Sequence, residues 1–193
     1  MRDFEYIKMQ KLHCRKSIRL KNYDYSSNGY YFVTICVQNR EKLFGEIVGA
    51  TLCGRPNNPD KIITKWLLEL ENKFNDIKID EYIIMPNHIH FIIKRTGDHT
   101  GSMGDHTGSP LLRDIIGWFK TMTTNEYIAG VKSGKFIPFK GRLWQRNYYE
   151  HIIRNYDDYI SIAEYIQNNP LKWGYDKLFV SEGKYGSKKK ERG

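Results

Sequence analysis

The stretch IDEYIIMPNHIHFIIK, residues 79–94, predicts two short strands that pair as a hairpin. Apolar side chains fill both halves, and Pro86 separates them because proline cannot donate a backbone hydrogen bond inside a continuous strand. Asn87 suits the turn, since asparagine tolerates the backbone angles that turns require. Met85-Pro86-Asn87 therefore marks the turn of a β-hairpin.

The elements on either side of this hairpin each show the strand or the helix period. Strands are indicated by apolar and β-branched runs, and helices by apolar residues that recur every three or four positions. The resulting order is βαββαβ plus a C-terminal helix, which is the ferredoxin-like (split βαβ) arrangement of an α+β domain. We expect an antiparallel sheet with helices on one face and the other face open. The flanking elements are a buried strand at 30–38, a helix from Asp60 to near Asn75, a helix after Pro110, a strand at 147–154 and a helix from Asn155 to Pro170.

Several connecting segments have the composition of loops. Gly, Pro and Asn residues predict a loop at 49–60, whose last residue, Asp60, can cap the following helix. The sequence GDHTGS occurs twice within 97–109 and predicts a surface loop, because so short a polar repeat cannot build a core. Residues 130–143 are expected to be a basic loop, and Lys120 in the helix before it is expected to face solvent.

Length and composition favour one globular domain that binds a polyanion. The chain has 193 residues and a net charge of +9, and its 40% hydrophobic content excludes wholesale disorder. We assign a single domain to 1–180, with a core at about 28–175, and a basic disordered tail to 181–193. No apolar run reaches the roughly 18 residues of a membrane span, and the basic N-terminus lacks a secretory signal, so we expect a cytoplasmic, nucleoid-associated protein. Three cysteines without CxxC spacing predict reduced thiols.

His88 and His90 are the most informative residues for chemistry. Because side chains alternate along a strand, both imidazoles project from one face while Ile89 and Phe91 enter the core. Two imidazoles on one face can hold a metal ion, and a preceding turn and a central strand favour that interpretation. Two histidines on a half-exposed strand are more often ordinary polar residues, so the spacing alone leaves both interpretations open.

Tyr165 and Asn169 are the second candidate pair. Tyr165 lies beside the apolar stripe of the third helix, and Asn169 follows one turn later on the same side, so a helix packed on the sheet aims both at its surface. The alternative is that Tyr165 is an aromatic residue at the core's edge and Asn169 a C-cap before Pro170. The stripe consists of Tyr159, Ile162, Ala163 and Ile166.

Four long runs occur in order along the chain, namely YYFVTICVQNREKLFG, IDEYIIMPNHIHFII, LWQRNYYEHIIRN and EYIQNNPLKW. In this order and at these separations they resemble the REP-associated tyrosine transposases, relatives of the single-tyrosine HUH transposases of small insertion sequences. HUH denotes histidine, hydrophobic residue, histidine, which is His88-Ile89-His90 here. The resemblance covers about residues 28–175, and several motifs in order are more specific than any one of them.

The resemblance implies a role for each of the four candidate residues. His88 and His90 would bind a divalent cation, Mg²⁺ or Mn²⁺, and Asn169 would complete the metal site. Tyr165 would be the nucleophile of a transposase that cleaves and rejoins single-stranded DNA at hairpin (palindromic repeat) elements through a 5′-phosphotyrosine intermediate. A phenol with a pKa near 10 is a weak nucleophile, so a cation at the phosphate fits this chemistry.

Four further residues are candidates for supporting the site or contacting DNA. His151 shares a strand face with Tyr149, and it either reaches the substrate or is a packed or hydrogen-bonded histidine. Trp144, Gln145 and Arg146 match the family's WQ-R run, although Trp144 suits the core equally well.

The expected partner is single-stranded or hairpin DNA, with no membrane, and the chain is either a monomer or a homodimer. Basic segments at 11–21, 132–146 and 184–192 predict phosphate contacts, and aromatic residues such as Tyr30 and Phe139 can stack on bases. A nonenzymatic single-stranded nucleic-acid-binding protein on the same fold is the main alternative. A metal-dependent nuclease that releases its products is a third class, and it would form no covalent adduct.

Overall fold

The computed structural model describes residues 28–48, 51–53, 59–96 and 111–180. Within them the predicted βαββαβ order with a C-terminal helix is confirmed, and a small hairpin is inserted after the first strand. The strands are β1 (Gly29–Cys36), β2 (Glu46–Val48), β3 (Thr51–Cys53), β4 (Ile77–Met85), β5 (His88–Arg95) and β6 (Tyr149–Ile153). The helices are the 3₁₀ helix η1 (Gln38–Arg40), α1 (Asp60–Lys73), α2 (Leu112–Lys132), α3 (Tyr156–Asn168) and the 3₁₀ helix η2 (Pro170–Tyr175).

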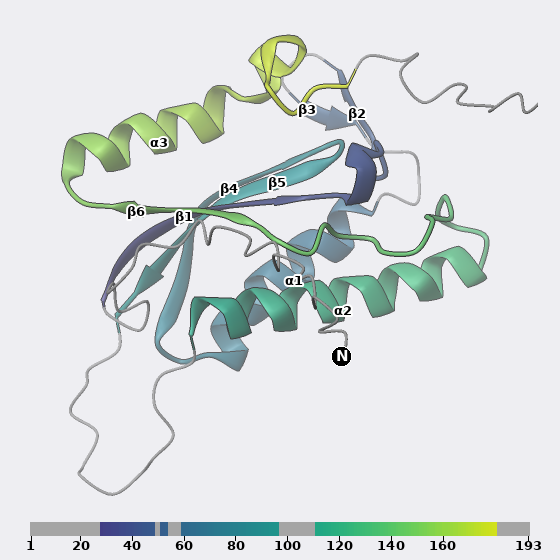
Figure 1. Cartoon of the computed structure of the whole chain (residues 1–193), viewed down its shortest axis with the longest axis horizontal. Helices are drawn as coiled ribbons and strands as arrows, with labels where there is room; N and C mark the ends of the chain where they lie inside the picture. The colour runs from purple at the N-terminus through teal and green to yellow at the C-terminus, as the bar shows by residue number, and fades with distance from the viewer. Residues whose placement is uncertain (1–27, 49–50, 54–58, 97–110, 181–193) are drawn as a thin grey trace, which may run out of the picture.

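The main sheet has the strand order β4-β5-β1-β6, and all its neighbouring strands are antiparallel (Figure 1). This is the ferredoxin-like order, so the predicted fold class is confirmed. The predicted hairpin is β4 and β5, joined at Pro86 and Asn87. Because β5 lies between β4 and β1, His88 pairs with Cys36 and His90 with Thr34 in the middle of the sheet.

The helices α1 and α2 cover one face of the sheet and bury the main core (Figure 1). Ile89 and Phe91 point into this core and are fully buried, as the strand period predicts. Tyr31, Val33 and Ile35 of β1 join them from the neighbouring strand. The residues between them therefore face the opposite side of the sheet.

That opposite face carries α3, so the prediction of an open face is wrong (Figure 1). Phe32 and Ile92 project from the sheet on this side and pack with Ile166 of the helix and Ile153 of β6. When a strand carries large apolar residues on both sides, packing against both faces of the sheet is favoured, because exposing these residues to water costs about 25 cal/mol per Å². A cavity remains on this face beside the C-terminal end of the helix, and His90 is among the residues that line it.

Two local predictions are also corrected. Residues 51–53 are β3, paired with β2, so the loop predicted at 49–60 contains a short strand. The N-cap position of α1 is occupied by Pro59, which makes no capping bond with its side chain, and Asp60 is the first residue inside the helix. Strands of three residues are too short to show an alternating pattern in the sequence. Their pairing in the structure is what identifies β2 and β3 as strands.

Lys120 does not face solvent, because the chain after α2 returns past it to reach β6. Its Nζ donates to the backbone carbonyls of Gln145 at 2.9 Å, Arg146 at 3.3 Å and Asn147 at 3.2 Å. Burial lowers the pKa of Lys120 to about 8. The helix α2 extends to Lys132, so the basic loop begins later than predicted.

Some predictions fall on other parts of the chain. The repeated GDHTGS segment, the basic N-terminus and the tail at 181–193 lie outside the described residues. Among those described, no helix is both long and apolar enough to cross a membrane. Cys36 is a free thiol, as predicted, and burial raises its pKa.

Candidate functional site

The two predicted histidines lie together on the sheet face that carries α3. Nε2 of His88 and Nε2 of His90 are 2.9 Å apart, and the ring centroids are separated by 4.5 Å. Both side chains are buried, at 0% and 2% exposure. His88 is covered by Trp173 of η2 rather than by the main core, with a centroid distance of 5.7 Å between the two rings.

The other nitrogen of each ring has a fixed partner. Asn87 donates through Nδ2 to the carbonyls of Arg40 at 3.2 Å and Leu178 at 2.9 Å, which turns its Oδ1 towards His88. Nδ1 of His88 therefore donates to that oxygen at 2.7 Å, an assignment made from the hydrogen-bond network. Nδ1 of His90 lies 2.8 Å from the hydroxyl of Thr34. The hydroxyl of Thr34 can accept a hydrogen bond from a protonated Nδ1 of His90. In the tautomer with a proton on each Nδ1, both Nε2 lone pairs point into the same space, which is the usual arrangement of metal-binding histidines.

Burial keeps both rings neutral. It lowers the pKa of His88 well below its ordinary value, and the neighbouring His90 lowers it further. Burial also lowers the pKa of His90 to about 4, although the carboxylate of Asp176 opposes this shift. Neutral imidazoles have free lone pairs at neutral pH, so no proton must be displaced before a cation binds.

Tyr165 reaches the histidines from α3, as predicted for a helix packed on the sheet. Its phenol oxygen lies 3.3 Å from Nε2 of His90 and 3.4 Å from Oδ2 of Asp176. The side chain is 44% exposed, so a bound molecule can contact its oxygen. Burial, followed by the negative charge of Asp176, raises the pKa of Tyr165 to about 12, which holds the phenol in its protonated form.

Asn169 lies one turn after Tyr165 and is buried, at 3% exposure. Its Nδ2 donates to Oδ2 of Asp176 at 3.0 Å. Its Oδ1 is buried and has no hydrogen-bond partner among the described residues. An unpaired buried amide oxygen is costly, so this atom is suited to a cation or to a donor on a bound molecule.

Asp176 is the residue of this site that sequence reasoning missed. One ligand atom from each of His88, His90 and Asp176 can be chosen so that all lie within 4.8 Å of one another. Asp176 comes directly after η2, and no periodicity or motif in the sequence indicates that its side chain turns back towards the sheet.

These donors fit a divalent cation. Two imidazole nitrogens lie 2.9 Å apart, and the carboxylate of Asp176 lies near them. The amide of Asn169 donates to that carboxylate and has an oxygen without a partner among the described residues. Oxygen donors suit Mg²⁺ and Mn²⁺, and Mn²⁺ accepts imidazole more readily than Mg²⁺ does.

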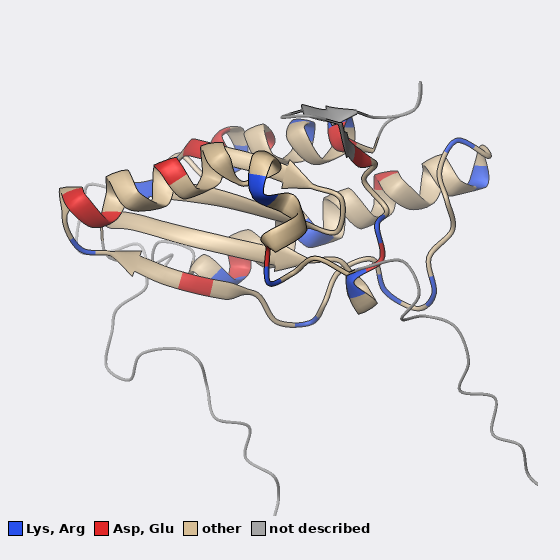
Figure 2. Ribbon diagram, turned by 90° about the horizontal axis from the view of Figure 1, so that it is seen from above, with Lys and Arg blue, Asp and Glu red and all other residues tan. Residues whose placement is uncertain are grey.

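A cavity of 750 Å³ opens beside Tyr165. Lys172 and Lys177 line it and can contact phosphates, while Tyr149 and Tyr175 are 55% and 94% exposed and can stack on bases. In Figure 2, acidic residues lie along α3 and basic residues lie on η2 and the adjoining loops. The cavity therefore combines positively charged lysine side chains with exposed aromatic rings at one end of the helix.

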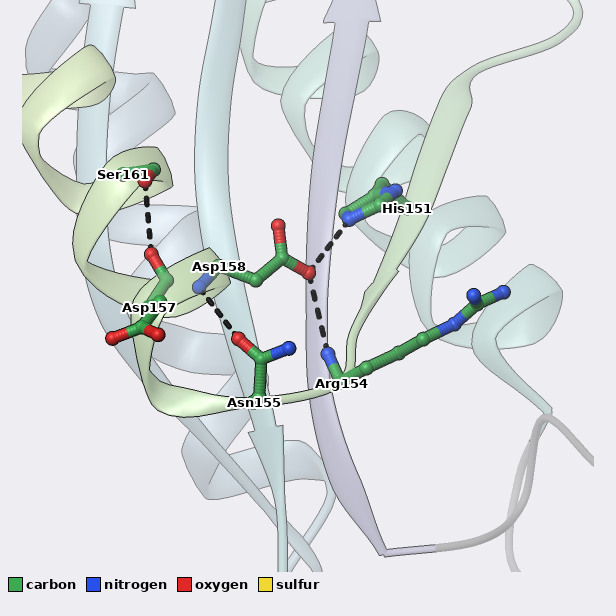
Figure 3. Close-up of polar contacts among 6 residues, drawn as sticks. All are labelled: His151, Arg154, Asn155, Asp157, Asp158 and Ser161. Carbon is green, nitrogen blue, oxygen red and sulfur yellow. Dashed lines mark hydrogen bonds and ion pairs between the residues drawn. The ribbon is translucent and has the colours of Figure 1, made fainter.

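His151 is hydrogen-bonded to Asp158 in the first turn of α3 (Figure 3). Its Nε2 lies 2.9 Å from Oδ2 of Asp158, which also accepts from the backbone N–H of Arg154 at 3.3 Å. The bond from His151 lowers the pKa of Asp158. Asn155 caps the same helix by accepting from the N–H of Asp158 at 2.8 Å, as predicted for the first residue of this helix.

The other three candidates have different surroundings. Trp144 is in the core at 4% exposure, and its Nε1 donates to the hydroxyl of Thr123 at 2.8 Å. Gln145 lines the cavity and is held to β1, where its backbone N–H donates to the carbonyl of Cys36 at 2.9 Å. Arg146 is exposed beside it.

The predicted stacking residues are held within the protein. The ring of Tyr30 packs against Tyr159, with centroids 5.4 Å apart, and the ring of Phe139 packs against Tyr127 at 5.7 Å. Tyr149 and Tyr175 in the cavity are more accessible to a base than either of them.

A ferredoxin-like sheet whose paired histidines face a helix tyrosine has the layout expected of a single-tyrosine transposase. Residues 25–169 match the family model described as "Transposase IS200 like", and the chain belongs to this family.

Similar proteins include REP-associated tyrosine transposases, in line with the sequence resemblance. The chain is 30% identical over 100 residues to a REP-associated tyrosine transposase of Escherichia coli, a match that covers 52% of this chain and 48% of that protein. It is 37% identical over 180 residues to an uncharacterized protein of Haemophilus influenzae, covering 88% and 95%. A solved structure of a REP-associated tyrosine transposase bound to a REP hairpin is similar in fold, with a TM-score of 0.52, 19% identity, and coverage of 83% of this chain and 77% of that one.

Proposed function

We propose that this protein cleaves and rejoins single-stranded DNA beside hairpin elements, with Tyr165 as the nucleophile. The observation that carries the proposal is the position of the phenol oxygen, 3.3 Å from Nε2 of His90 at the edge of an open cavity. Membership in a transposase family supports the choice of DNA as the substrate. The REP hairpin bound by the transposase of similar fold supports the choice of a hairpin element.

The residues of the site divide the chemistry among them. The oxygen of Tyr165 attacks a backbone phosphorus, the bond from phosphorus to the 3′ oxygen breaks, and a 5′-phosphotyrosine and a free 3′-hydroxyl result. Attack by a 3′-hydroxyl on the same phosphorus reverses these bond changes and rejoins the strand. The phenol gives up its proton during attack and the departing 3′ oxygen takes one up. Because the pKa of the phenol is raised to about 12, it is a weak nucleophile, and a positive charge at the phosphate would assist the attack.

His88, His90 and Asn169 are the residues that we propose hold a divalent cation, Mg²⁺ or Mn²⁺. Such a cation supplies a Lewis acid for the scissile phosphate and offsets the charge of the transition state. Asn87 and Thr34 fix the two rings, which keeps both Nε2 atoms directed at the site.

The cavity favours an unpaired strand over a duplex. A single strand can bend to bring one phosphate to Tyr165 while its bases stack on Tyr149 and Tyr175. Contacts from Lys172 and Lys177 to the backbone would make binding weaken as salt rises, whereas preference for the hairpin's sequence would persist because it depends on base contacts.

Adduct formation tests the proposal. The purified chain is incubated with Mn²⁺ or Mg²⁺ and a labelled oligonucleotide in which single strands flank a hairpin, and a denaturing gel then shows any protein-bound label. We expect an adduct from the wild type and from Tyr149→Phe, which removes a hydroxyl from the same cavity, but none from Tyr165→Phe. DNA affinity should stay within about threefold, since only one oxygen is lost.

The alternatives give different results in the same assay. Tight binding without cleavage would identify a nonenzymatic nucleic-acid-binding protein, and cleavage without an adduct would identify a nuclease. An adduct that persists in Tyr165→Phe and disappears in Tyr149→Phe would show that Tyr165 is not the nucleophile. Equal or tighter binding to blunt duplex, with the hairpin left uncut, would refute the proposed substrate.

Tyr165 faces the histidines of its own chain, so we expect each chain to use its own tyrosine. A mixture of Tyr165→Phe with His90→Asn should therefore form no adduct. Recovered activity in the mixture would show that α3 serves a second copy of the chain instead.

A further inference from the structure

A carboxylate from outside the predicted motifs lies beside the two histidines. Asp176 can place one oxygen within 4.8 Å of a ring nitrogen of both His88 and His90. Its Oδ2 also accepts from Nδ2 of Asn169 at 3.0 Å and lies 3.4 Å from the phenol oxygen of Tyr165. The carboxylate therefore contacts the nucleophile and Asn169, and it lies within a few ångströms of both histidines.

We propose that Asp176 is a protein ligand of the divalent cation, together with His88 and His90. The inference rests on the proposed function, because it concerns the same cation. Two imidazoles and an amide oxygen bring no negative charge, whereas Mg²⁺ and Mn²⁺ in proteins are typically held by at least one carboxylate. Asp176 supplies that charge, and Asn169, whose Nδ2 donates to the same carboxylate, has a buried Oδ1 without a partner among the described residues.

The two oxygens of Asp176 have separate surroundings. Oδ1 accepts from the backbone N–H of Leu178 at 2.6 Å, which fixes the orientation of the carboxylate. Oδ2 is thereby turned towards Asn169 and Tyr165, on the histidine side. The backbone N–H of Asp176 donates to the carbonyl of Trp173 at 3.1 Å and ends η2 at this position.

The closing segment, residues 176–179, is docked on the turn that precedes the histidines. Nδ2 of Asn87 donates to the carbonyl of Leu178 at 2.9 Å, and Nη1 of Arg40 donates to the carbonyl of Lys177 at 3.3 Å. Phe179 packs against Trp173, with ring centroids 5.2 Å apart. Because Asn87 also orients His88, one asparagine aligns a histidine and the segment that carries the carboxylate.

A purely structural role for Asp176 is the competing explanation, because its carboxylate also accepts hydrogen bonds from the backbone N–H of Leu178 and from Nδ2 of Asn169. Asp176→Asn separates the two roles, since the amide retains an oxygen for the N–H of Leu178 but loses the negative charge. Asp80→Asn is the matched control. Oδ2 of Asp80 accepts from the hydroxyl of Tyr159 at 2.7 Å, so this variant also removes one charge and changes a carboxylate bonded to a tyrosine of α3.

The test is calorimetric titration of the full-length chain with Mn²⁺ alone. We expect Asp176→Asn to weaken Mn²⁺ binding roughly tenfold or more, and Asp80→Asn to bind within about twofold of the wild type. Asp176→Glu, which restores the charge, should bind more tightly than Asp176→Asn. Unfolding by urea in EDTA checks that each variant folds before titration.

The outcomes separate this inference from the proposed function. If Asp176→Asn binds Mn²⁺ as tightly as the wild type while His90→Asn does not bind, Asp176 is not a ligand and the metal site of the proposed function stands. If Asp176→Asn and Asp176→Glu lose affinity equally, the side chain acts through packing and the inference fails. If the wild type binds no Mn²⁺, both the inference and the metal dependence of the proposed function fail.

Discussion

Asn87→Ala should destabilise the fold and weaken the metal site together. The side chain is fully buried and makes three hydrogen bonds. Nδ2 donates to the carbonyls of Arg40 and Leu178, and Oδ1 accepts from His88. Alanine removes all three bonds and leaves the N–H of a buried imidazole without its acceptor.

The size of the effect follows from these bonds. Each contributes about 1 kcal/mol net, so the free energy of unfolding should fall by about 3 kcal/mol. In a chain of this length that corresponds to a loss of roughly 6 to 12 °C in melting temperature. Mn²⁺ affinity should fall by about 10- to 100-fold, because the ring of His88 loses its orienting partner.

Urea unfolding in EDTA measures the first effect, and titration with Mn²⁺ measures the second. Asn168→Ala is the matched control: Asn168 is exposed and its Nδ2 donates to the carbonyl of Glu164 at 2.8 Å, so its loss should cost under about 0.5 kcal/mol. A loss below about 1 kcal/mol in Asn87→Ala, equal to that of the control, would refute the argument that the three hydrogen bonds of Asn87 stabilise the fold. A loss of stability with unchanged Mn²⁺ affinity would refute the role in orienting His88.

Further predictions concern the pH dependence of stability and the contribution of a buried ion pair. Because the folded protein holds the pKa of His90 near 4 while the unfolded chain has the ordinary value of 6.5, the unfolded state takes up the proton first. His90 alone should therefore lower stability in EDTA by about 3 kcal/mol between pH 6.5 and 4, and His88, whose pKa is also lowered, adds to the loss. His90→Asn should reduce this dependence, and an unchanged slope in urea titrations would contradict it. Asp76→Ala removes an ion-pair partner of Arg95, which is 2% exposed, and should cost about 3 kcal/mol by urea unfolding. Asp114→Ala, which breaks an exposed pair with Arg113 at 3.2 Å, should cost under about 1 kcal/mol, and equal losses in the two variants would refute the argument from burial.

The parts of the fold that could be predicted are those that a local period determines. Alternation along β5 places His88 and His90 on one face and Ile89 on the other, whatever packs against the sheet. The helical period of α3 likewise predicts that Tyr165 and Asn169 face the sheet, and the phenol is found beside His90.

The remaining features depend on contacts between distant parts of the chain. Lys120 has a sequence neighbourhood typical of a solvent-facing position, yet a loop 25 residues later supplies its acceptor. Leu178 accepts a hydrogen bond from Asn87 across 91 positions, and no local signal in either segment indicates this contact. Asp176 could not be predicted for the same reason, since its placement follows from that docking.

The family match has a bearing on this last point. It ends at Asn169, so it contains both histidines and the tyrosine but stops before Asp176 and the closing segment. If Asp176 is a ligand, the residues shared with the family are insufficient to describe this site, and the segment that follows α3 belongs to it. Asn87→Ala releases the docking of that segment, whereas Asp176→Asn retains the docking and removes the charge. Loss of Mn²⁺ affinity in both variants, with loss of stability mainly in Asn87→Ala, would show that Asn87 holds the segment in place and that Asp176 is the residue through which the segment contributes to Mn²⁺ binding.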